Sequence, residues 1–441
     1  MMIANNKPWI YAILIGLVFL FSPKQTLAFI EVQEVETSSG VSAWLVEDRR
    51  LPIVTISLSW RGGSALDPQG QEGLSSLMAS LMNEGAGDRD SLSFQEEMAR
   101  LGARISFNAS RDQISATIQL ITQNRDETVA LAVDAINAPR FDDEAISRMK
   151  GEALASLRYQ QQSPSNIAQD AWFARAFAGH GYAHPSNGTQ AGILAITQDG
   201  LLAHHRAIFA KENAVVSIVG DMSATTARTV IEKIFAKLPS RALLNLRAAP
   251  KLQANGDALI TRDGPQTQVV FGLPGIGIND PDLYPSLVMN HILGGGGFSS
   301  RLMDEVREKR GLTYSISSGF IDLDAGPIWV GRFASDNSKV GEALETVKNE
   351  IRRISQEPIG VDELNKAKTY LTGSYALRFD SGRSITNQLT AVQIYGWSKT
   401  HFENRNAKIE AVTSDDILRV AKRVFNDQEL IIQFVGRPRL D

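Results

Sequence analysis

The sequence of 441 residues contains no cysteine. Neither a disulfide bond nor thiolate–metal chemistry is therefore available to this protein. An exported protein without disulfides needs a sizeable hydrophobic core. The length and the 43% of hydrophobic residues are sufficient for two or three such cores.

The N-terminal apolar run is too short to cross a bilayer, which takes about 20 residues. It spans 13 residues, Trp9–Phe21, and follows the positive charge of Lys7. Ser22-Pro23 then interrupts it, and Thr26-Leu27-Ala28 offers small residues for cleavage. This is the pattern of a secretory signal over residues 1–28. We expect export to the periplasm of a Gram-negative bacterium, with membrane anchoring by an uncleaved signal as the alternative.

An excess of positive charge is also absent. The 45 Lys and Arg residues stand against 49 Asp and Glu residues, which gives a formal net charge of −4. This balance argues against nucleic acid as a partner.

Hydrophobic periodicity predicts that the second half of the chain repeats the first. Leu51–Trp60 alternates apolar and polar residues, as a strand packed on one face does, and Gln268–Leu273 corresponds to it. The helix around Arg307 likewise corresponds to the helix around Met98. The repeat predicts an α+β fold of two sandwich-like halves, each a largely antiparallel sheet with helices packed on one side. The expected domains are residues 29–240 and 257–441, joined by a polar linker at 241–256.

The stretch Gly294–Ser318 reads GGGGFSSRLMDEVREKRGLTYSISS and predicts a helix followed by a strand. Ser299 or Ser300 can cap the helix after the glycines, and Gly311 is expected to end it. In the strand, alternate residues are expected to share one face. These residues are Leu312, Tyr314 and Ile316.

Arg307 and Tyr314 are then expected to point towards the same end of this helix–strand unit. A guanidinium and a phenol so placed could hold a peptide carbonyl and stabilise the oxyanion that forms when water attacks it. Both residues also have purely structural explanations. The helix dipole favours an arginine near a helix C-terminus, and packing favours a tyrosine on a strand.

The same stretch closely resembles the second-domain signature of the pitrilysin/insulinase-type peptidases, the inverted zincins. The segment YAHPSNGT…LLAHHRAIFAKENAVVSIVGDM resembles the end of the family's first domain. The resemblance covers essentially the whole chain after the signal, and it implies two halves that form half of a clam-shell. In that family an Arg/Tyr pair in the second domain completes an active site whose zinc is bound in a first domain. The resemblance places this pair on Arg307 and Tyr314.

The zinc motif of the family is missing. Inverted zincins bind zinc through H-x-x-E-H on one helix and a glutamate on a later helix. The resemblance places Ser76 and Ser80 at the histidines, Ala79 at the catalytic glutamate and Ser156 at the third ligand. Glu152 is the only nearby acid, and one carboxylate does not make a zinc site. We therefore expect no metal in this chain and no peptide hydrolysis by the chain alone.

The six histidines offer no clear substitute. His180 and His184 have the spacing of ligands on a helix, but Gly181 and Pro185 predict a loop. The vicinal pair His204-His205 is expected to point in two directions and to be structural. The remaining histidines, His291 and His401, have no evident partner in the sequence.

Two functions remain, from different classes. In the first, the chain is the non-metal subunit of a heterodimeric zinc peptidase. A homologous H-x-x-E-H partner then supplies zinc, and this chain supplies Arg307 and Tyr314 for hydrolysis of extended peptides. In the second, it is a non-enzymatic peptide-binding or scaffold protein of the cell envelope.

Overall fold

The computed structural model describes residues 30–244, 252, 256–425 and 429–440. From Val32 onward, the described residues form one compact unit. The predicted signal and most of the predicted linker lie outside the described residues. Within the described ranges, no helix is long and apolar enough to cross a membrane.

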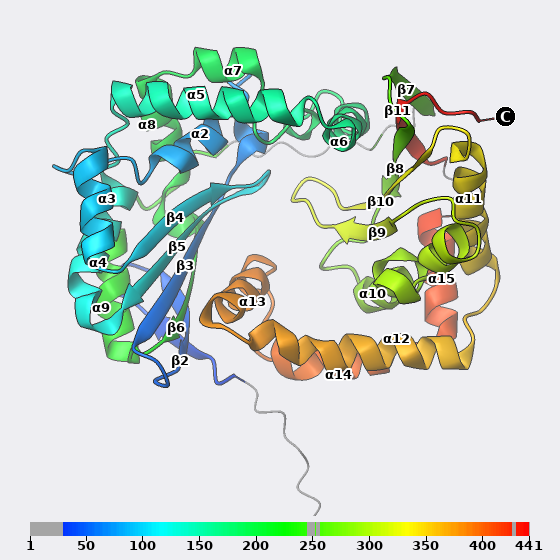
Figure 1. Ribbon diagram of the computed structural model, residues 1–441. Coiled ribbons are helices and arrows are strands. Elements are labelled where there is room, and N and C mark those ends of the chain that lie inside the picture. The colour runs from blue at the N-terminus through cyan, green and yellow to red at the C-terminus, as the bar shows by residue number, and fades with distance from the viewer. Residues whose placement is uncertain (1–29, 245–251, 253–255, 426–428, 441) are drawn as a thin grey trace, which may run out of the picture. The chain divides into compact units, whose positions relative to one another are not determined.

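The first half of the chain builds a six-stranded sheet in the order β1-β2-β6-β3-β5-β4 (Figure 1). β2 and β6 pair in parallel, and the other neighbours are antiparallel. The strands are β1 (Gln33–Glu36), β2 (Ser42–Glu47), β3 (Ile53–Arg61), β4 (Arg104–Ala109), β5 (Gln113–Ile121) and β6 (Ala214–Gly220). The helices are α2 (Leu74–Leu81), α3 (Ser91–Arg100), α4 (Arg125–Asn137), α5 (Asp143–Gln160), α6 (Pro164–Ala176), α7 (Gln190–Ala195), α8 (Gln198–Ile208) and α9 (Ala224–Phe235).

The second half builds a five-stranded sheet in the order β7-β11-β8-β10-β9. Its strands are β7 (Asp257–Thr261), β8 (Gln266–Pro274), β9 (Ile316–Ile321), β10 (Ile328–Asp336) and β11 (Ile431–Gly436). Its α-helices are α10 (Leu283–Asn290), α11 (Val340–Gln356), α12 (Val361–Gly373), α13 (Gly382–Ile394), α14 (His401–Glu410) and α15 (Ser414–Phe425). Two π-helical segments lie at the glycine run: His291–Gly295 includes its first two glycines, and Met303–Glu308 follows it.

The two sheets share one topology once β1 is set aside. The order β2-β6-β3-β5-β4 matches β7-β11-β8-β10-β9, and the single parallel pair stands at the same place in both. The internal repeat and the two largely antiparallel sheets predicted from the sequence are thus confirmed.

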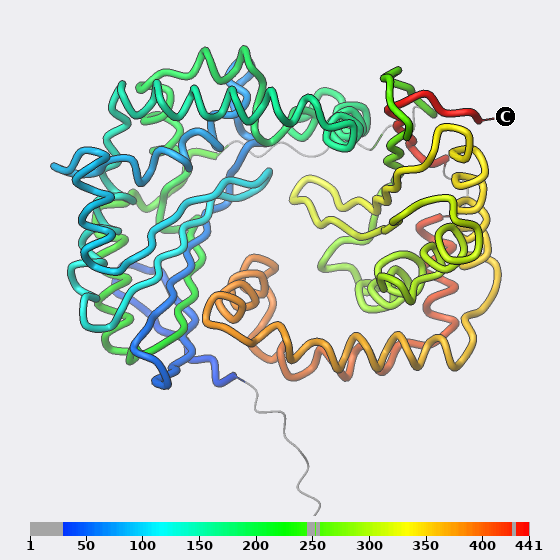
Figure 2. The backbone as a smooth tube through the Cα atoms, viewed as in Figure 1, coloured from blue at the N-terminus to red at the C-terminus, as the bar shows by residue number. Residues whose placement is uncertain are grey.

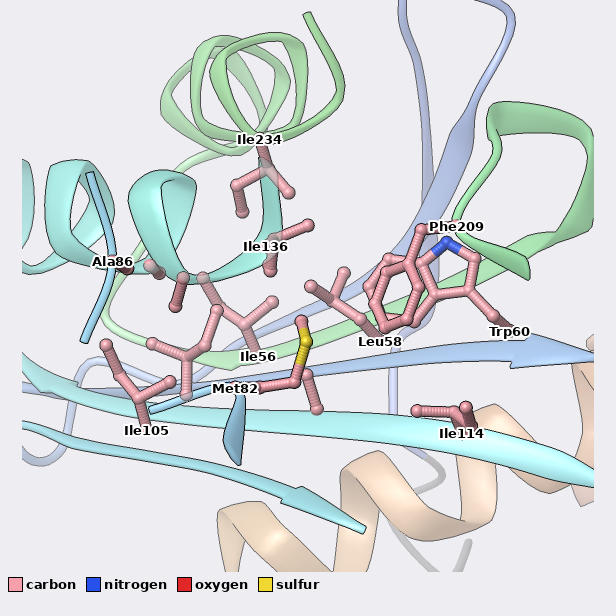
Figure 3. Packing of buried hydrophobic residues seen from close by; sticks show 14 of the residues in the cluster. Ile56, Leu58, Trp60, Met82, Ala86, Ile105, Ile114, Ile136, Phe209 and Ile234 are labelled. Atoms are coloured by element: carbon pink, nitrogen blue, oxygen red, sulfur yellow. The ribbon is translucent and has the colours of Figure 1, made fainter. Parts of the chain in front are cut away.

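One face of the first sheet carries the larger hydrophobic core. Figure 3 shows Ile56, Leu58 and Trp60 of β3 facing side chains from the helices above them. Trp60 is fully buried, and its ring centroid lies 4.5 Å from that of Phe209. Each such side chain contributes about 1.5–3 kcal/mol by leaving water. The apolar residues of the alternating strand therefore anchor helices of the same half, as expected.

The polar face of β3 is buried as well, so the expectation of a strand packed on one face was wrong. Ser57 and Ser59 are only 6% and 3% exposed. Ser57 lies under α13, which comes from the second half of the chain, and Thr390 of α13 donates to its hydroxyl at 3.4 Å. Thr390 of α13 is 2.9 Å from the hydroxyl of Ser217, and Gln393 donates to that hydroxyl at 2.9 Å. Hydrogen bonds between polar groups allow this face to be covered without a desolvation penalty.

The second sheet is covered in the same way by a helix of the first half. α6 lies against β8 and β11 (Figure 2). Trp172 of α6 is fully buried, and its indole N–H donates to the carbonyl of Ile431 at 2.8 Å. Each half thus lends one helix to the sheet of the other. Sequence periodicity does not reveal this exchange, because it joins segments that are far apart in the chain.

Candidate active site

The helix that carries Arg307 ends as the sequence predicts. Gly311 adopts φ +59°, a conformation that glycine reaches without steric cost. Its N–H donates to the carbonyl of Arg307 at 2.8 Å, and the N–H of Leu312 donates to Val306 at 2.9 Å. This nested pair is the usual glycine-based helix end.

The start of that helix differs from the expected serine cap. The hydroxyl of Ser299 donates to the carbonyl of Gly296, and that of Ser300 to Gly297, each at 2.8 Å. Both hydroxyls are therefore directed back into the glycine turn, and no side chain caps the π-helical segment.

The prediction that Tyr314 lies on a strand face was also wrong. β9 begins only at Ile316, and Tyr314 stands in a bend before it. The preceding Thr313 explains the bend, because its hydroxyl donates to the carbonyls of Ser315 at 2.9 Å and Ala334 at 2.6 Å. Tyr314 consequently points outward and is 83% exposed.

The structure nevertheless brings Arg307 and Tyr314 together. The guanidinium carbon of Arg307 lies 5.2 Å from the Tyr314 ring centroid and 4.6 Å from that of Phe298. The Arg307 side chain is 25% exposed, and its ion pair is with the exposed Glu308 at 3.4 Å. Such exposed pairs are weak, so the guanidinium N–H groups can still bind a ligand.

Phe298 is the residue that the sequence interpretation missed. It follows the glycine run and is 71% exposed, although it is large and apolar. The run must pack closely to place it, since a Cβ on Gly294 would lie 2.4 Å from the Ser318 hydroxyl. The sequence did contain a signal for Phe298: an aromatic residue that follows a glycine run and fits no periodic apolar pattern can be expected at the surface, where it can contact a ligand or another side chain.

The predicted zinc-motif positions also lie together, at a cavity of about 390 Å³ between α2 and α5. Ser76 and Ser80 line it from α2, and Ser156 and Glu152 line it from α5. Ala79 is on the buried side of α2 and is 3% exposed.

These residues do not fit zinc. The Ser76 hydroxyl donates to the carbonyl of Ser186, and the Ser80 hydroxyl to Leu77, each at 2.8 Å. Hydroxyls are poor zinc ligands beside imidazole and carboxylate. Within the part of the chain that the structure describes, no three His, Cys, Asp or Glu side chains gather in a way that could hold a metal ion.

The vicinal histidines of α8 are structural. His204 Nε2 lies 2.8 Å from the hydroxyl of Ser75, whereas His205 Nε2 lies 2.8 Å from the carbonyl of Ile136. The two side chains thus have separate partners, as predicted. Burial lowers the pKa of each imidazole to about 4, so both are neutral near pH 7.

The other histidines have partners that the sequence did not reveal. His180 and His184 flank a 3-10 turn, as the loop prediction requires, and His180 Nδ1 accepts from the N–H of Tyr182 at 3.2 Å. The ring centroid of His291 lies 4.9 Å from that of Tyr370, and that of His401 lies 4.3 Å from that of Trp397.

Two family models match adjacent parts of the chain. Insulinase (Peptidase family M16) matches residues 44–190, and Peptidase M16 inactive domain matches residues 195–371. The chain belongs to peptidase family M16. The resemblance to the insulinase-type peptidases is thereby confirmed.

M16 relatives match the chain over most of its length. The non-peptidase homolog YmxG of Helicobacter pylori is 26% identical and covers 86% of this chain and 87% of its own. An uncharacterized zinc protease of Streptomyces coelicolor is 24% identical, with coverages of 82% and 80%. Mitochondrial-processing peptidase subunit beta of Lentinula edodes is 22% identical, with coverages of 91% and 90%.

Solved M16 structures agree with the fold. The crystal structure of a peptidase M16 inactive domain from Pseudomonas fluorescens has a TM-score of 0.87 at 29% identity, and covers 93% of this chain and 98% of its own. A protease from Helicobacter pylori has a TM-score of 0.85 at 17% identity, with coverages of 92% and 100%. This second likeness concerns the fold alone.

Proposed function

We propose that this M16 protein is the non-metal subunit of a heterodimeric periplasmic zinc peptidase. A homologous partner with an intact H-x-x-E-H motif supplies the zinc site, and this chain supplies Arg307 and Tyr314. The substrates are extended, unstructured peptides. The observation that carries the proposal is the contact between Arg307 and Tyr314 at the surface, in a chain whose three zinc-ligand positions hold serines.

The chemistry of the pair fits an oxyanion site. The guanidinium of Arg307 can donate two N–H groups to a carbonyl oxygen. The phenol of Tyr314 offers one O–H donor, and the side chain is 83% exposed and so accessible to a ligand. Donors held in place before reaction stabilise the negative charge that develops on the carbonyl oxygen as water attacks.

Export to the periplasm rests on the signal-like residues 1–28 of the sequence, namely a positive start, an apolar run and small residues at the end. Detection of the mature N-terminus in a periplasmic fraction tests this part of the proposal. Retention of the full chain in the membrane fraction would instead support anchoring.

A second candidate function is a non-enzymatic peptide-binding or scaffold role in the cell envelope. The H. pylori relative favours it, because that protein is named a non-peptidase homolog. In this case the stacked arginine and tyrosine would bind a ligand without hydrolysing it.

Mixing experiments distinguish the two candidates. The purified chain, an H-x-x-E-H homologue from the same organism, and their mixture are each given zinc and an unstructured fluorogenic peptide. We expect hydrolysis by the mixture to exceed the sum of the separate activities. Arg307→Ala and Tyr314→Phe should each lower turnover of the mixture about a hundredfold, as loss of an oxyanion donor does.

Two matched variants control for loss of an arginine or a tyrosine elsewhere. Arg206→Ala alters an exposed arginine of α8, and Tyr159→Phe alters a tyrosine of α5 that is 76% exposed. Both should leave turnover unchanged. Full activity of the mixture with Arg307→Ala or Tyr314→Phe would refute the peptidase role and favour the scaffold.

A further inference from the structure

The cavity between α2 and α5 has two chemically different walls. Its polar wall consists of Ser76, Ser80, Glu152, Ser156 and Asn187. Its apolar wall consists of Gly73, Leu77, Met149, Ala153, Leu157 and Ile193. A volume of about 390 Å³ is near the lower end for ligand sites, so it suits one side chain or a small molecule.

The hydroxyls on α2 are acceptors towards the cavity. A serine hydroxyl has one proton and two lone pairs. Ser76 and Ser80 each give that proton to a backbone carbonyl, at Ser186 and at Leu77. Only lone pairs are then left for an occupant. The two residues are one helical turn apart, so both face the same side.

The facing helix adds a further acceptor pair. Glu152 and Ser156 are also one turn apart, on α5. Ser156 accepts from the side-chain amide of Gln160 at 3.0 Å. Of the described residues that line the cavity, Glu152 is the only charged one.

The nearby cations neutralise this carboxylate only in part, because the closest one is shared with another acid. Arg148 is 3.8 Å from Glu152 but is hydrogen-bonded to Glu84 at 2.7 Å. Lys150 donates to the carbonyls of Leu194 and Ile196, at 3.1 and 2.5 Å. The cavity therefore presents one carboxylate and several oxygen acceptors, which favours a cation with several donors over an anion.

The apolar wall identifies the rest of the ligand. Leu77, Leu157 and Ile193 are buried members of the main core, and Met149 packs against them. Unbranched aliphatic stems with a charged end lie on such surfaces while the charged group reaches polar atoms. A bare metal ion would make no use of this wall.

We propose that this cavity binds a primary ammonium group on an unbranched aliphatic stem, namely a lysine side chain of an extended peptide. The three N–H donors of the ammonium meet the lone pairs of Ser76, Ser80 and Glu152, and the methylene groups lie along Leu77 and Met149. The site belongs to this chain alone, so it does not depend on the proposed peptidase partner.

Direct binding to the purified chain tests this site. The probes are peptides of Gly, Ala and Ser with a single central lysine, norleucine or arginine, and affinity is measured by calorimetry. Norleucine has the unbranched stem without the ammonium. We expect the lysine peptide to bind at least tenfold more tightly than either of the others.

Variants and a local probe place the binding in the cavity. Glu152→Gln and Ser80→Ala should reduce the lysine preference severalfold or abolish it. Glu96→Gln, the same change at an exposed residue of α3, should not. In ¹³C-methyl methionine spectra, the lysine peptide should shift Met149 and leave Met98 unchanged.

Several results would overturn the proposal. They are equal binding of the norleucine or arginine peptide, an unaltered lysine preference in Glu152→Gln, and shifts at Met98 without a shift at Met149. Because no partner and no turnover enter these measurements, failure here would leave the peptidase proposal standing, and failure of the mixing experiment would leave this site standing.

Discussion

At the residue scale, Arg307 contacts two aromatic rings. Phe298 and Tyr314 lie 4.6 and 5.2 Å from its guanidinium carbon. An exposed contact of this kind is worth about 0.5–1 kcal/mol. Phe298 is 71% exposed, so replacing it removes the contact with Arg307 without opening the core.

Replacing Phe298 should therefore loosen Arg307 without unfolding the chain. We expect Phe298→Ala to lower turnover of the mixed peptidase about two- to fivefold, which corresponds to the loss of one cation–π contact. Phe298→Tyr should retain activity. Leu92→Ala is the control, because Leu92 is 68% exposed on α3. ¹⁵Nε relaxation of Arg307 provides a readout without turnover, and unchanged mobility in Phe298→Ala would contradict this role.

The sequence predicted the residue types of this site better than their geometry. The family signature identified Arg307 and Tyr314, and Gly311 identified the helix end. The bend at Tyr314 was missed because it depends on a hydrogen bond from Thr313 to Ala334, 21 residues away. A local alternation pattern contains no information about such a contact.

At the element scale, α8 combines two neutral imidazoles with a buried carboxyl nearby. Burial lowers the pKa of His204 and His205 to about 4. Burial also raises the pKa of Asp67 to about 6, although Asp67 accepts from the N–H groups of Gly73 and Ser75 at the start of α2. Folding thus weakens proton binding at the two histidines and strengthens it at Asp67.

Stability should rise with pH between about 4 and 6.5. In this interval the unfolded imidazoles bind protons and the folded ones do not, so the free energy of unfolding increases as protons leave the unfolded state. Each histidine contributes on the order of 2–3 kcal/mol. Asp67 opposes this between about pH 4 and 6, because its folded carboxyl keeps a proton that the unfolded one has lost.

Urea unfolding at pH 4.5, 5.5 and 6.5 tests this assignment. His205→Gln, whose amide can still donate to Ile136, should reduce the rise with pH. Asp67→Asn should make the rise steeper, whereas Asp199→Asn, at an exposed residue of α8, should not. An unaltered pH dependence in His205→Gln would show that this imidazole is not the group responsible.

At the scale of the whole compact unit, the exchanged helices α6 and α13 join the two repeats. The repeat itself was predictable, because strand and helix periodicity recurs in the same order along the chain. The exchange was not predictable, because the sequence of β3 alternates in the same way whether its polar face contacts solvent or packs against α13. The structure distinguishes the two cases, because Thr390 of α13 donates to Ser57 of β3 at 3.4 Å and Gln393 donates to Ser217 of the neighbouring β6 at 2.9 Å.

A glycine in β8 makes the α6 contact possible. A Cβ on Gly272 would lie 2.6 Å from Cζ2 of Trp172 and 2.7 Å from the carbonyl oxygen of Trp329. Neither neighbour can move freely, since Trp172 is fully buried and its indole is hydrogen-bonded to Ile431. We therefore expect Gly272→Ala to lower the free energy of unfolding by about 1–3 kcal/mol, the usual cost of overpacking.

Gly319 of β9 is the matched control, because a Cβ there would meet no atom within 4 Å. Gly319→Ala should be nearly neutral. Trp172→Phe removes the part of the ring that collides with the new methyl group, so the double variant with Gly272→Ala should lose less stability than the sum of the single variants. Equal effects of alanine at 272 and 319, measured by calorimetry, would contradict tight packing between α6 and the second sheet. A coupling close to zero in the double variant would assign the cost to the backbone of Trp329 rather than to the exchanged helix.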